Sequence, residues 1–284
     1  MAVRWTGRTT LAGYLATVAL TAFASLSEAP HDLPSVSVPP GADDIVARHV
    51  EARGGLATWR KLNRMVWVGH IEPSAERAVP PLPFLLEQAR PNRTRFEIKS
   101  DSLPSVRIFD GNRGWKLRAV PGGGPVLRDF SADEVRYARE TSSIDGDLVD
   151  AAEKGNRVTL EGEDSVDGQP AYRLLVQLPS GVRHHVWIDA KSFLDVRADR
   201  EVRGAGGQVG WVMVMNRDFK DFDGLKLPTR IETGSDAAHA PDVMVIERVL
   251  VNPPLDERTF TRPRVPGTSG RARVLAEPDG RGSR

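Results

Sequence analysis

The chain of 284 residues contains no cysteine. It therefore has no disulfide framework, no thiolate metal site and no thiol nucleophile. Motifs of other chemistries are also missing, because the sequence holds no G-x-S-x-G nucleophile elbow, no H-E-x-x-H helix and no Walker loop. The glycine-rich segment from Gly204 to Gly210 does not match G-x-G-x-x-G, and it lies between predicted strands rather than before a helix. The sequence gives no indication of a catalytic centre, a metal site or a cofactor of these kinds.

Individual histidine and acidic residues also give little indication of a metal site or a catalytic centre. His184 and His185 are neighbours on a predicted strand, so they point to opposite faces and cannot hold one metal ion together. Glu161 and Asp221 each begin an acidic pair suited to acid–base chemistry, but each lies at a strand edge or turn, where solvated carboxylates are common. We therefore expect that the protein is not an enzyme. A hydrolase that uses Glu161 or Asp221 is the alternative.

The N-terminal apolar run lacks the length of a membrane-spanning helix. Arg4 and Arg8 precede an uncharged stretch of about 14 residues, from Leu11 to about Ala24, whereas a bilayer-spanning helix needs about 20. The stretch ends in "AFA", an A-x-A-like cleavage site. This layout predicts a cleaved secretory signal peptide at residues 1–24, with an uncleaved membrane anchor as the alternative. No cysteine follows the run, which excludes bacterial lipoprotein processing.

The body of the chain has fewer basic than acidic residues. After removal of residues 1–24, 37 basic residues face 38 acidic ones, and six of the arginines lie from Arg262 onward. The body before Arg262 carries about −5, whereas a nucleic-acid-binding surface needs a basic field. We expect no nucleic-acid partner. Residues 25–42, rich in Pro and Ser, are predicted to form a flexible leader, and residues 263–284, rich in Gly, Arg and Pro, a disordered tail.

Most of the remaining chain alternates with a period of two residues. In "RTRFEIKS" the charged residues point to one side, whereas Phe96 and Ile98 point to the other, which is typical of a strand with one wet and one apolar face. Asp-Gly turns at 110–111, 167–168 and 223–224 join such strands into hairpins. About ten strands in consecutive antiparallel hairpins predict a mainly β (α+β) fold, with one curved sheet that forms an incomplete barrel.

Two helical regions are predicted, at residues 43–62 and 130–154. Asp43 and Asp44 suit the first turn of one helix, and Ser131 with Glu134 resembles a capping box at the start of the other. We expect these helices to cover the concave face of the curved sheet.

Several strands are apolar on both faces. "WVMVM" at residues 211–215 is the clearest case, and "YRLLVQL" and "DVMVIERVLV" are similar. Two interpretations stay open: core packing beneath the helices, or a hydrophobic ligand cavity with the adaptable Met213 and Met215 among its walls.

Four stretches, in this order and spacing, resemble the outer-membrane lipoprotein-sorting protein group related to LolA: "VDGQPAYRLLV", "WIDAKSFLDVRADRE", "DFDGLKLPTRIE" and "NPPLDERTF". The stretch "ARHVEARGGLATWRKLNRMVWVGHI" is similar to the start of the mature domain of that group. The resemblance covers residues 43–262. The leader, the "PPLP" connection and the arginine-rich tail depart from it.

The resemblance implies an incomplete β-barrel with helices that plug its concave side. It also implies a periplasmic carrier or binder of lipid or lipoprotein acyl chains, without catalysis. The partners would be a lipid or an acylated lipoprotein and a donor or acceptor protein at the inner or outer membrane, and the protein would act as a monomer. An envelope-stress sensor or interaction module on the same fold is the alternative. By analogy with the apolar lining of the carriers, the expected cavity residues are Met65, Trp67, Phe96, Ile98, Trp115, Leu174, Val176, Trp211, Met213 and Met215.

Overall fold

The computed structural model describes residues 40–74, 79–99, 104–118, 124–203, 209–234 and 241–265, and for residues 200–203 and 209 it describes the backbone only. The described residues belong to one compact unit that begins at Pro40. The predicted signal peptide at 1–24, most of the predicted leader at 25–42 and the predicted tail beyond residue 265 lie outside the described residues.

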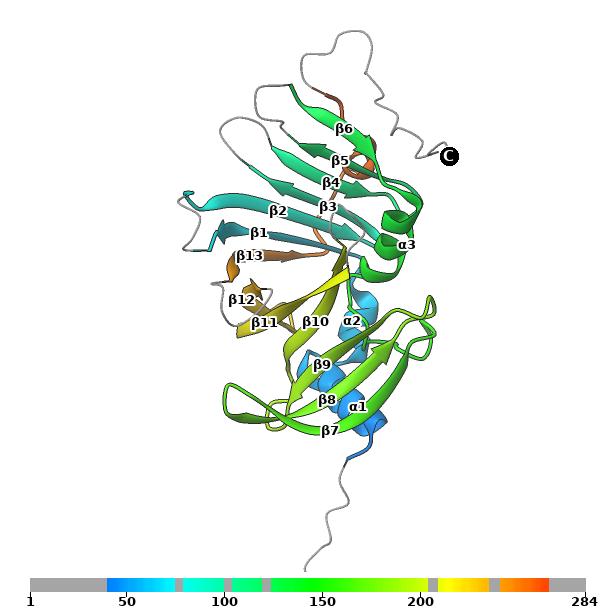
Figure 1. Ribbon diagram of the computed structural model, residues 1–284, viewed down its shortest axis with the longest axis vertical. Coiled ribbons are helices and arrows are strands. Elements are labelled where there is room, and N and C mark those ends of the chain that lie inside the picture. The colour runs from blue at the N-terminus through cyan, green and yellow to red at the C-terminus, as the bar shows by residue number, and fades with distance from the viewer. Residues whose placement is uncertain are drawn as a thin grey trace, which may run out of the picture. The chain divides into compact units, whose positions relative to one another are not determined.

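Thirteen antiparallel strands form one sheet (Figure 1). In chain order they are β1 (Arg64–Glu72), β2 (Leu82–Ala89), β3 (Arg93–Ile98), β4 (Ser105–Phe109), β5 (Gly114–Arg118), β6 (Val126–Asp129), β7 (Arg157–Val166), β8 (Gln169–Gln177), β9 (Arg183–Asp189), β10 (Asp195–Arg203), β11 (Val209–Phe222), β12 (Leu225–Gly234) and β13 (Asp242–Val251). Their spatial order is β6-β5-β4-β3-β2-β1-β13-β12-β11-β10-β9-β8-β7, so β6 and β7 are the two edges. The sheet curls without closing, and the predicted fold class is confirmed.

Two hairpin turns have Asp-Gly pairs as their central residues, as the sequence predicts. Asp167 and Gly168 have φ angles of 51° and 76°, and Asp223 and Gly224 have φ angles of 51° and 83°. Positive φ at both central residues is the geometry of a type I′ turn, which matches the right-handed twist of the flanking strands. The predicted turns are confirmed at both positions.

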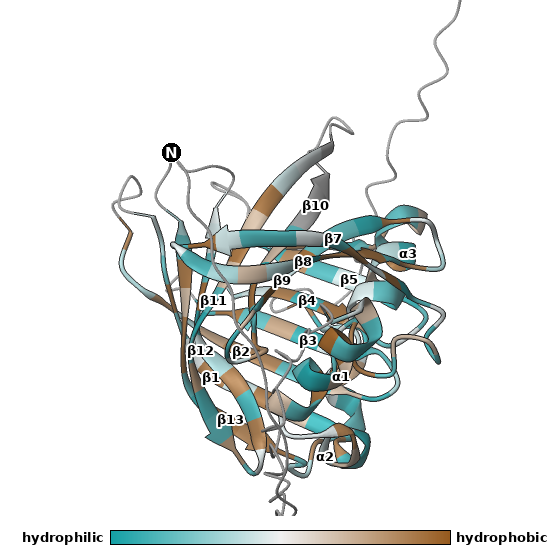
Figure 2. Cartoon of the chain, turned by 90° about the horizontal axis from the view of Figure 1, so that it is seen from below, coloured by the Kyte–Doolittle hydropathy of each residue, from teal (hydrophilic) through white to brown (hydrophobic). Residues whose placement is uncertain are grey.

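Among the described residues, three α-helices accompany the sheet: α1 (Ala42–Ala52), α2 (Leu56–Lys61) and α3 (Ala132–Thr141). The strands curve around α1 and α2, so we call this side of the sheet the concave face and the other side the convex face (Figure 2). None of the helices in the described part of the chain is long and apolar enough to cross a membrane.

The bend between α1 and α2 fits against the β11–β12 turn. Gly54 has a φ of 115°, and a Cβ atom there would lie 2.0 Å from the carbonyl oxygen of Gly224. Only glycine permits this approach. Arg53 donates to the carbonyl of Lys226 at 2.7 Å and to Asp195 at 2.6 Å. These contacts fix the helix pair on the concave face.

The segment that joins β6 to β7 begins with the predicted helix, but this helix is shorter than predicted. Ser131 and Glu134 form the expected capping box of α3, but the helix ends at Thr141 and turns follow to residue 155. Asp145, whose side chain is 1% exposed, fixes these turns. It accepts hydrogen bonds from Arg90, Lys154 and Ser143.

A short segment after β13 packs against the convex face of β4 and β5. After β13 the chain forms a short 3-10 helix, η1 (Glu257–Phe260), in which Phe260 is 2% exposed. Its ring packs in one cluster with Trp115, Ile108 and Val106. Trp115 is therefore a core residue of the convex side.

His49 links α1 to the β9–β10 turn, and we predict that it makes stability depend on pH. Its Nδ1 lies 3.0 Å from the carbonyl oxygen of Phe193, and burial lowers its pKa below the usual value, although Asp195 partly offsets this. Because the unfolded pKa is about 6.5, protonation favours the unfolded chain, so this stability is present above about pH 6.5 and is lost below it.

Relative to His49→Gln, which keeps a donor for the carbonyl, we expect the wild type to lose up to about 1.4 kcal/mol of unfolding free energy per pH unit below about pH 6. Urea unfolding of both proteins between pH 7 and pH 5 measures this difference. Parallel pH profiles for the two proteins would contradict the assignment.

Candidate hydrocarbon-binding surface

Strand pairing assigns each side chain to a face, because directly paired residues of antiparallel strands point to the same side. Val249, Trp67, Leu86 and Phe96 pair in succession across β13, β1, β2 and β3. Trp67 packs in the core cluster that contains Trp59 of α2, so this row lies on the concave face.

Apart from Asp242 at the start of β13, which accepts the backbone N–H of Ser74 at 2.9 Å, the concave positions of these four strands carry no charged side chain. They are occupied by Met65, Trp67, Gly69 and Ile71 in β1, by Leu82, Phe84, Leu86 and Gln88 in β2, by Thr94, Phe96 and Ile98 in β3, and by Met244, Ile246, Val249 and Val251 in β13. The other charged side chains of these strands lie on the convex face, where Glu87 and Arg95, for example, are 3.4 Å apart.

Beneath α1 and α2 the concave face is filled by the protein's own side chains. The members of this cluster that are at most 2% exposed are Trp59, Leu62, Met65, Phe84, Val149, Leu225 and Leu227. A second cluster under α1 joins Ile45 to Leu148, Leu174 and Val176. This part of the concave face is a packed core.

Farther from the helices, the concave face stays apolar but is only half-buried. We call this surface the apolar rim and define it as Ile71, Leu86, Phe96, Ile98, Ile231 and Met244. α2 leads into the start of β1, and Ile71 lies near the other end of that strand. Ile71 pairs with Met244, which in turn pairs with Ile231. Ile71 also pairs with Leu82, and Phe84, two residues later on the same face of β2, pairs with Ile98. Through these two side chains the rim residues form one continuous apolar surface on which a hydrocarbon chain can lie.

Six of the ten expected cavity residues lie on the concave face. Phe96 and Ile98 belong to the rim, and Met65 and Trp67 lie beside it in the packed core. Leu174 and Val176 are 0% exposed beneath α1. The structure therefore brings Met65, Trp67, Phe96 and Ile98 together, whereas Leu174 and Val176 belong to the separate cluster around Ile45.

The other four expected residues, Trp115, Trp211, Met213 and Met215, lie on the convex face, which corrects the expectation that they face inward. In β11, Asn216 pairs with the concave residue Ile231, so Met215 and the odd-numbered residues before it point the other way. Met215 is buried on the convex side against Val166 and Trp187, so the alternation in "WVMVM" does not indicate the inner face. Trp211, 47% exposed, is the least covered.

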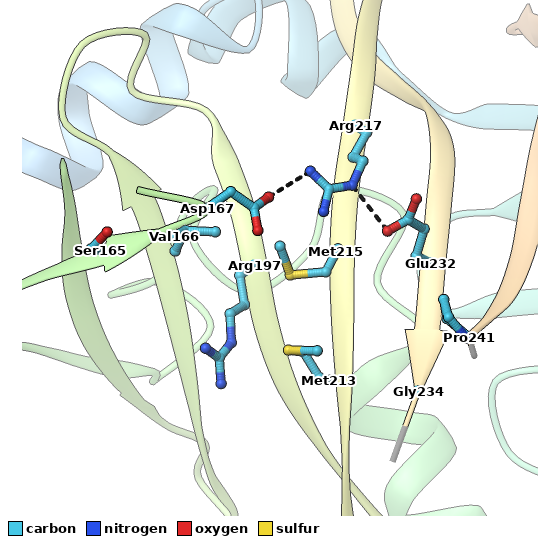
Figure 3. Close-up of a pocket in the computed structure, with 10 residues that line it drawn as sticks. All are labelled: Ser165, Val166, Asp167, Arg197, Met213, Met215, Arg217, Glu232, Gly234 and Pro241. Carbon is cyan, nitrogen blue, oxygen red and sulfur yellow. Dashed lines mark hydrogen bonds and ion pairs between the residues drawn. The ribbon is translucent and has the colours of Figure 1, made fainter. Parts of the chain in front are cut away.

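Met213 and Met215 line a small convex pocket (Figure 3). Its volume is about 230 Å³, below the range of about 300–1,000 Å³ typical of small-molecule sites. Arg217 crosses it and pairs with Asp167 at 2.7 Å and Glu232 at 3.0 Å. Burial acts to raise the pKa of Glu232, but hydrogen bonds from Arg217 and Arg230 outweigh it and hold the pKa below its usual value. The pocket is too small for a long acyl chain.

The carboxylates considered for catalysis have structural partners. Glu161 lies 3.0 Å from Arg173 and 3.3 Å from His185 on the convex side. Asp221 accepts the backbone N–H of Gly224 at 3.1 Å, which closes the β11–β12 turn. His184 instead lies 3.2 Å from Asp147. The two histidines therefore point to opposite faces, as predicted.

Sequence reasoning missed four of the six rim residues: Ile71, Leu86, Ile231 and Met244. Ile71 follows Trp67 by four residues in one strand, so alternation alone indicates that both share a face. The pairing of Leu86, Ile231 and Met244 with them depends on strand register, which the sequence does not indicate.

No protein-family model matches the chain, and no curated protein is similar to it at a significant level. Solved structures do match. A DUF1329 family protein from Desulfovibrio piger superposes with a TM-score of 0.51 at 12% identity, over 78% of this chain and 97% of that chain. A domain assigned to outer membrane lipoprotein sorting from Vibrio parahaemolyticus gives a TM-score of 0.50 at 9% identity, over 78% and 95%.

A LolA superfamily protein from Nitrosomonas europaea has a TM-score of 0.49 at 15% identity, with 78% of this chain and 98% of that chain covered. At such identities, the two matches with higher TM-scores establish the fold alone. The chain therefore shares the fold of a lipoprotein-sorting domain, as the resemblance of its sequence predicts.

Proposed function

We propose that the protein binds the hydrocarbon chain of a lipid or an acylated lipoprotein on the apolar rim, reversibly and without catalysis. The predicted signal peptide supports action in the periplasm, where the protein would pass its cargo between membrane-associated partners. The observation that carries the proposal is a continuous, half-buried apolar surface on strands whose concave positions are uncharged apart from Asp242 at the start of β13.

The energetics of this surface suit a carrier. Burial of a methylene group contributes about 0.8 kcal/mol, so a chain of about 16 carbons contributes at most about 12 kcal/mol. Association costs about 4–15 kcal/mol, and an open rim buries only part of the chain. Net affinity should therefore be modest, which allows release as well as uptake.

We expect affinity to rise with the length of the bound chain. Each methylene that the rim buries should tighten binding up to about fourfold, because about 0.8 kcal/mol corresponds to that ratio. Displacement of a fluorescent fatty acid by saturated fatty acids of increasing length, each below its micellar concentration, measures this series.

The gain should stop once the chain exceeds the rim. A folded protein that takes up no fluorescent fatty acid in a saturable way would contradict the proposal. Equal affinity for short and long chains would also contradict it, because contact with hydrocarbon would then not drive binding.

An interaction module is the second candidate, and the convex face favours it. A 230 Å³ pocket next to an exposed tryptophan, Trp211, is the size of a side-chain anchor rather than of a lipid. Retention of a membrane-anchored regulator on the immobilised protein, lost in Met215→Glu and combined with no fatty-acid uptake, would support this candidate instead.

A further inference from the structure

The row of concave side chains that forms part of the apolar rim continues into basic residues. Phe96 of β3 pairs with Arg107 of β4, Arg107 pairs with Lys116 of β5, and Lys116 pairs with Arg128 of β6. Arg118, two residues after Lys116, points to the same face. We call Arg107, Lys116, Arg118 and Arg128 the basic cluster.

The basic cluster has little counter-charge. Glu134 of α3 receives hydrogen bonds from Lys116 at 2.8 and 2.9 Å and lies 3.9 Å from Arg107. Burial acts to raise the pKa of Glu134, but the bonds from Lys116 and from the Ser131 backbone outweigh it, so the group is ionised.

The remaining charges give no further compensation. Asp133, the other acid in the first turn of α3, pairs with Arg136. Arg118 and Arg128 have no ion pair within the described ranges. Among the residues that the structure describes, four cations therefore face one carboxylate.

This arrangement is unfavourable for the sheet itself. Like charges that lie directly opposite each other on adjacent strands are destabilising, and the cluster contains two such pairs. On the convex face, charges of opposite sign lie side by side: Glu87 pairs with Arg95, and Arg217, which lies opposite Arg230, shares the carboxylate of Glu232 with it. An anion that lies against the concave side would relieve this repulsion.

We propose that the preferred ligand is an anionic amphiphile, whose hydrocarbon chain lies on the apolar rim while its phosphate or carboxylate head group lies on the basic cluster. This inference rests on the proposed function and adds the chemical class of the head group. Adjacent strands are about 4.8 Å apart, so the step from Phe96 to Arg107 matches the step from the first carbons of a chain to its head group. Guanidinium groups also bind phosphate and carboxylate in bidentate geometry.

The test compares ligands with one chain and different head groups. Dodecyl phosphate, dodecyl maltoside and dodecyltrimethylammonium are titrated into the protein below their micellar concentrations by calorimetry, with inorganic phosphate as a fourth ligand. We expect dodecyl phosphate to bind at least about tenfold tighter than the maltoside, as one charge-assisted contact provides, and the cation to bind weakest. The preference should shrink at high salt.

Two double variants test whether the basic cluster causes the preference for the anionic head group. Arg107→Gln combined with Arg128→Gln should remove most of the preference and leave the affinity for the maltoside unchanged. Arg183→Gln combined with Arg248→Gln removes the same charge from exposed convex positions and should keep the preference.

Four results would overturn the inference, and they separate it from the proposed function. Equal binding of all three head groups, or a preference that survives in the Arg107 and Arg128 variant, would overturn it and leave acyl-chain binding intact. Inorganic phosphate that binds as tightly as dodecyl phosphate would also overturn it, because the chain would then contribute nothing. Absence of binding by all three amphiphiles would overturn the proposed function as well.

Discussion

Asp145→Ala should lower the free energy of unfolding by about 3–5 kcal/mol, as expected when one partner of a buried ion pair is removed. The side chain is 1% exposed, and its removal leaves Arg90 and Lys154 without their carboxylate. Arg90 also donates to the carbonyls of Leu62 and Trp59, so the loss extends to α2. Urea unfolding monitored by tryptophan fluorescence measures the change.

The pH dependence of this contribution has a definite sign. Burial acts to raise the pKa of Asp145, but the hydrogen bonds from Lys154, Ser143 and Arg90 outweigh it, and the pKa lies below its usual value. The stabilisation is therefore present above about pH 4 and is lost as the pH falls through the folded-state pKa.

A surface ion pair of the same chemistry is the control for Asp145. Asp133 and Arg136 lie on the outside of α3 with both side chains more than 60% exposed, and Asp133→Ala should cost less than about 1 kcal/mol. Equal losses in the two variants would show that Asp145 does not fix the connection between the edge strands.

Ile98→Glu should weaken fatty-acid binding at least about 30-fold, because a carboxylate on the apolar rim must be desolvated when the chain covers it. Ile98 is half-buried on the concave face and pairs with Phe84, so the new carboxylate has no cation directly opposite it on β2. Displacement of the fluorescent fatty acid measures the effect, and circular dichroism checks the fold.

Met213→Glu is the matched control for Ile98→Glu, because Met213 is a half-buried apolar residue on the convex face. We expect fatty-acid binding of this variant to equal that of the wild type. The opposite pattern, with binding lost in Met213→Glu and kept in Ile98→Glu, would place the lipid on the other side of the sheet.

The sequence indicated the sheet and its turns well, because both depend on local chemistry. Alternation in β3 identifies Phe96 and Ile98 as one face from a single strand. Asp-Gly pairs set positive φ at Gly168 and Gly224 whatever the rest of the chain does. The four residues of β6, by contrast, are too few for alternation to be recognised.

The inner face could not be identified where distant parts of the chain cover the outer one. Trp115 is buried on the convex side by Phe260, which follows it by more than a hundred residues. Met215 is buried there by Val166 of the β7–β8 hairpin. At these positions of β5 and β11 the convex side chains are apolar because distant parts of the chain pack against them. Alternation with a period of two residues therefore does not distinguish the concave face from the convex face there.

Photolabelling with a diazirine-bearing palmitate, followed by peptide mapping, tests most directly whether hydrocarbon lies on the apolar rim. The account predicts label on peptides from β1, β2, β3 and β13, suppressed by excess unlabelled palmitate and reduced in Ile98→Glu. Label that concentrates on β11 around Met213 and Met215, or that palmitate does not suppress, would contradict it.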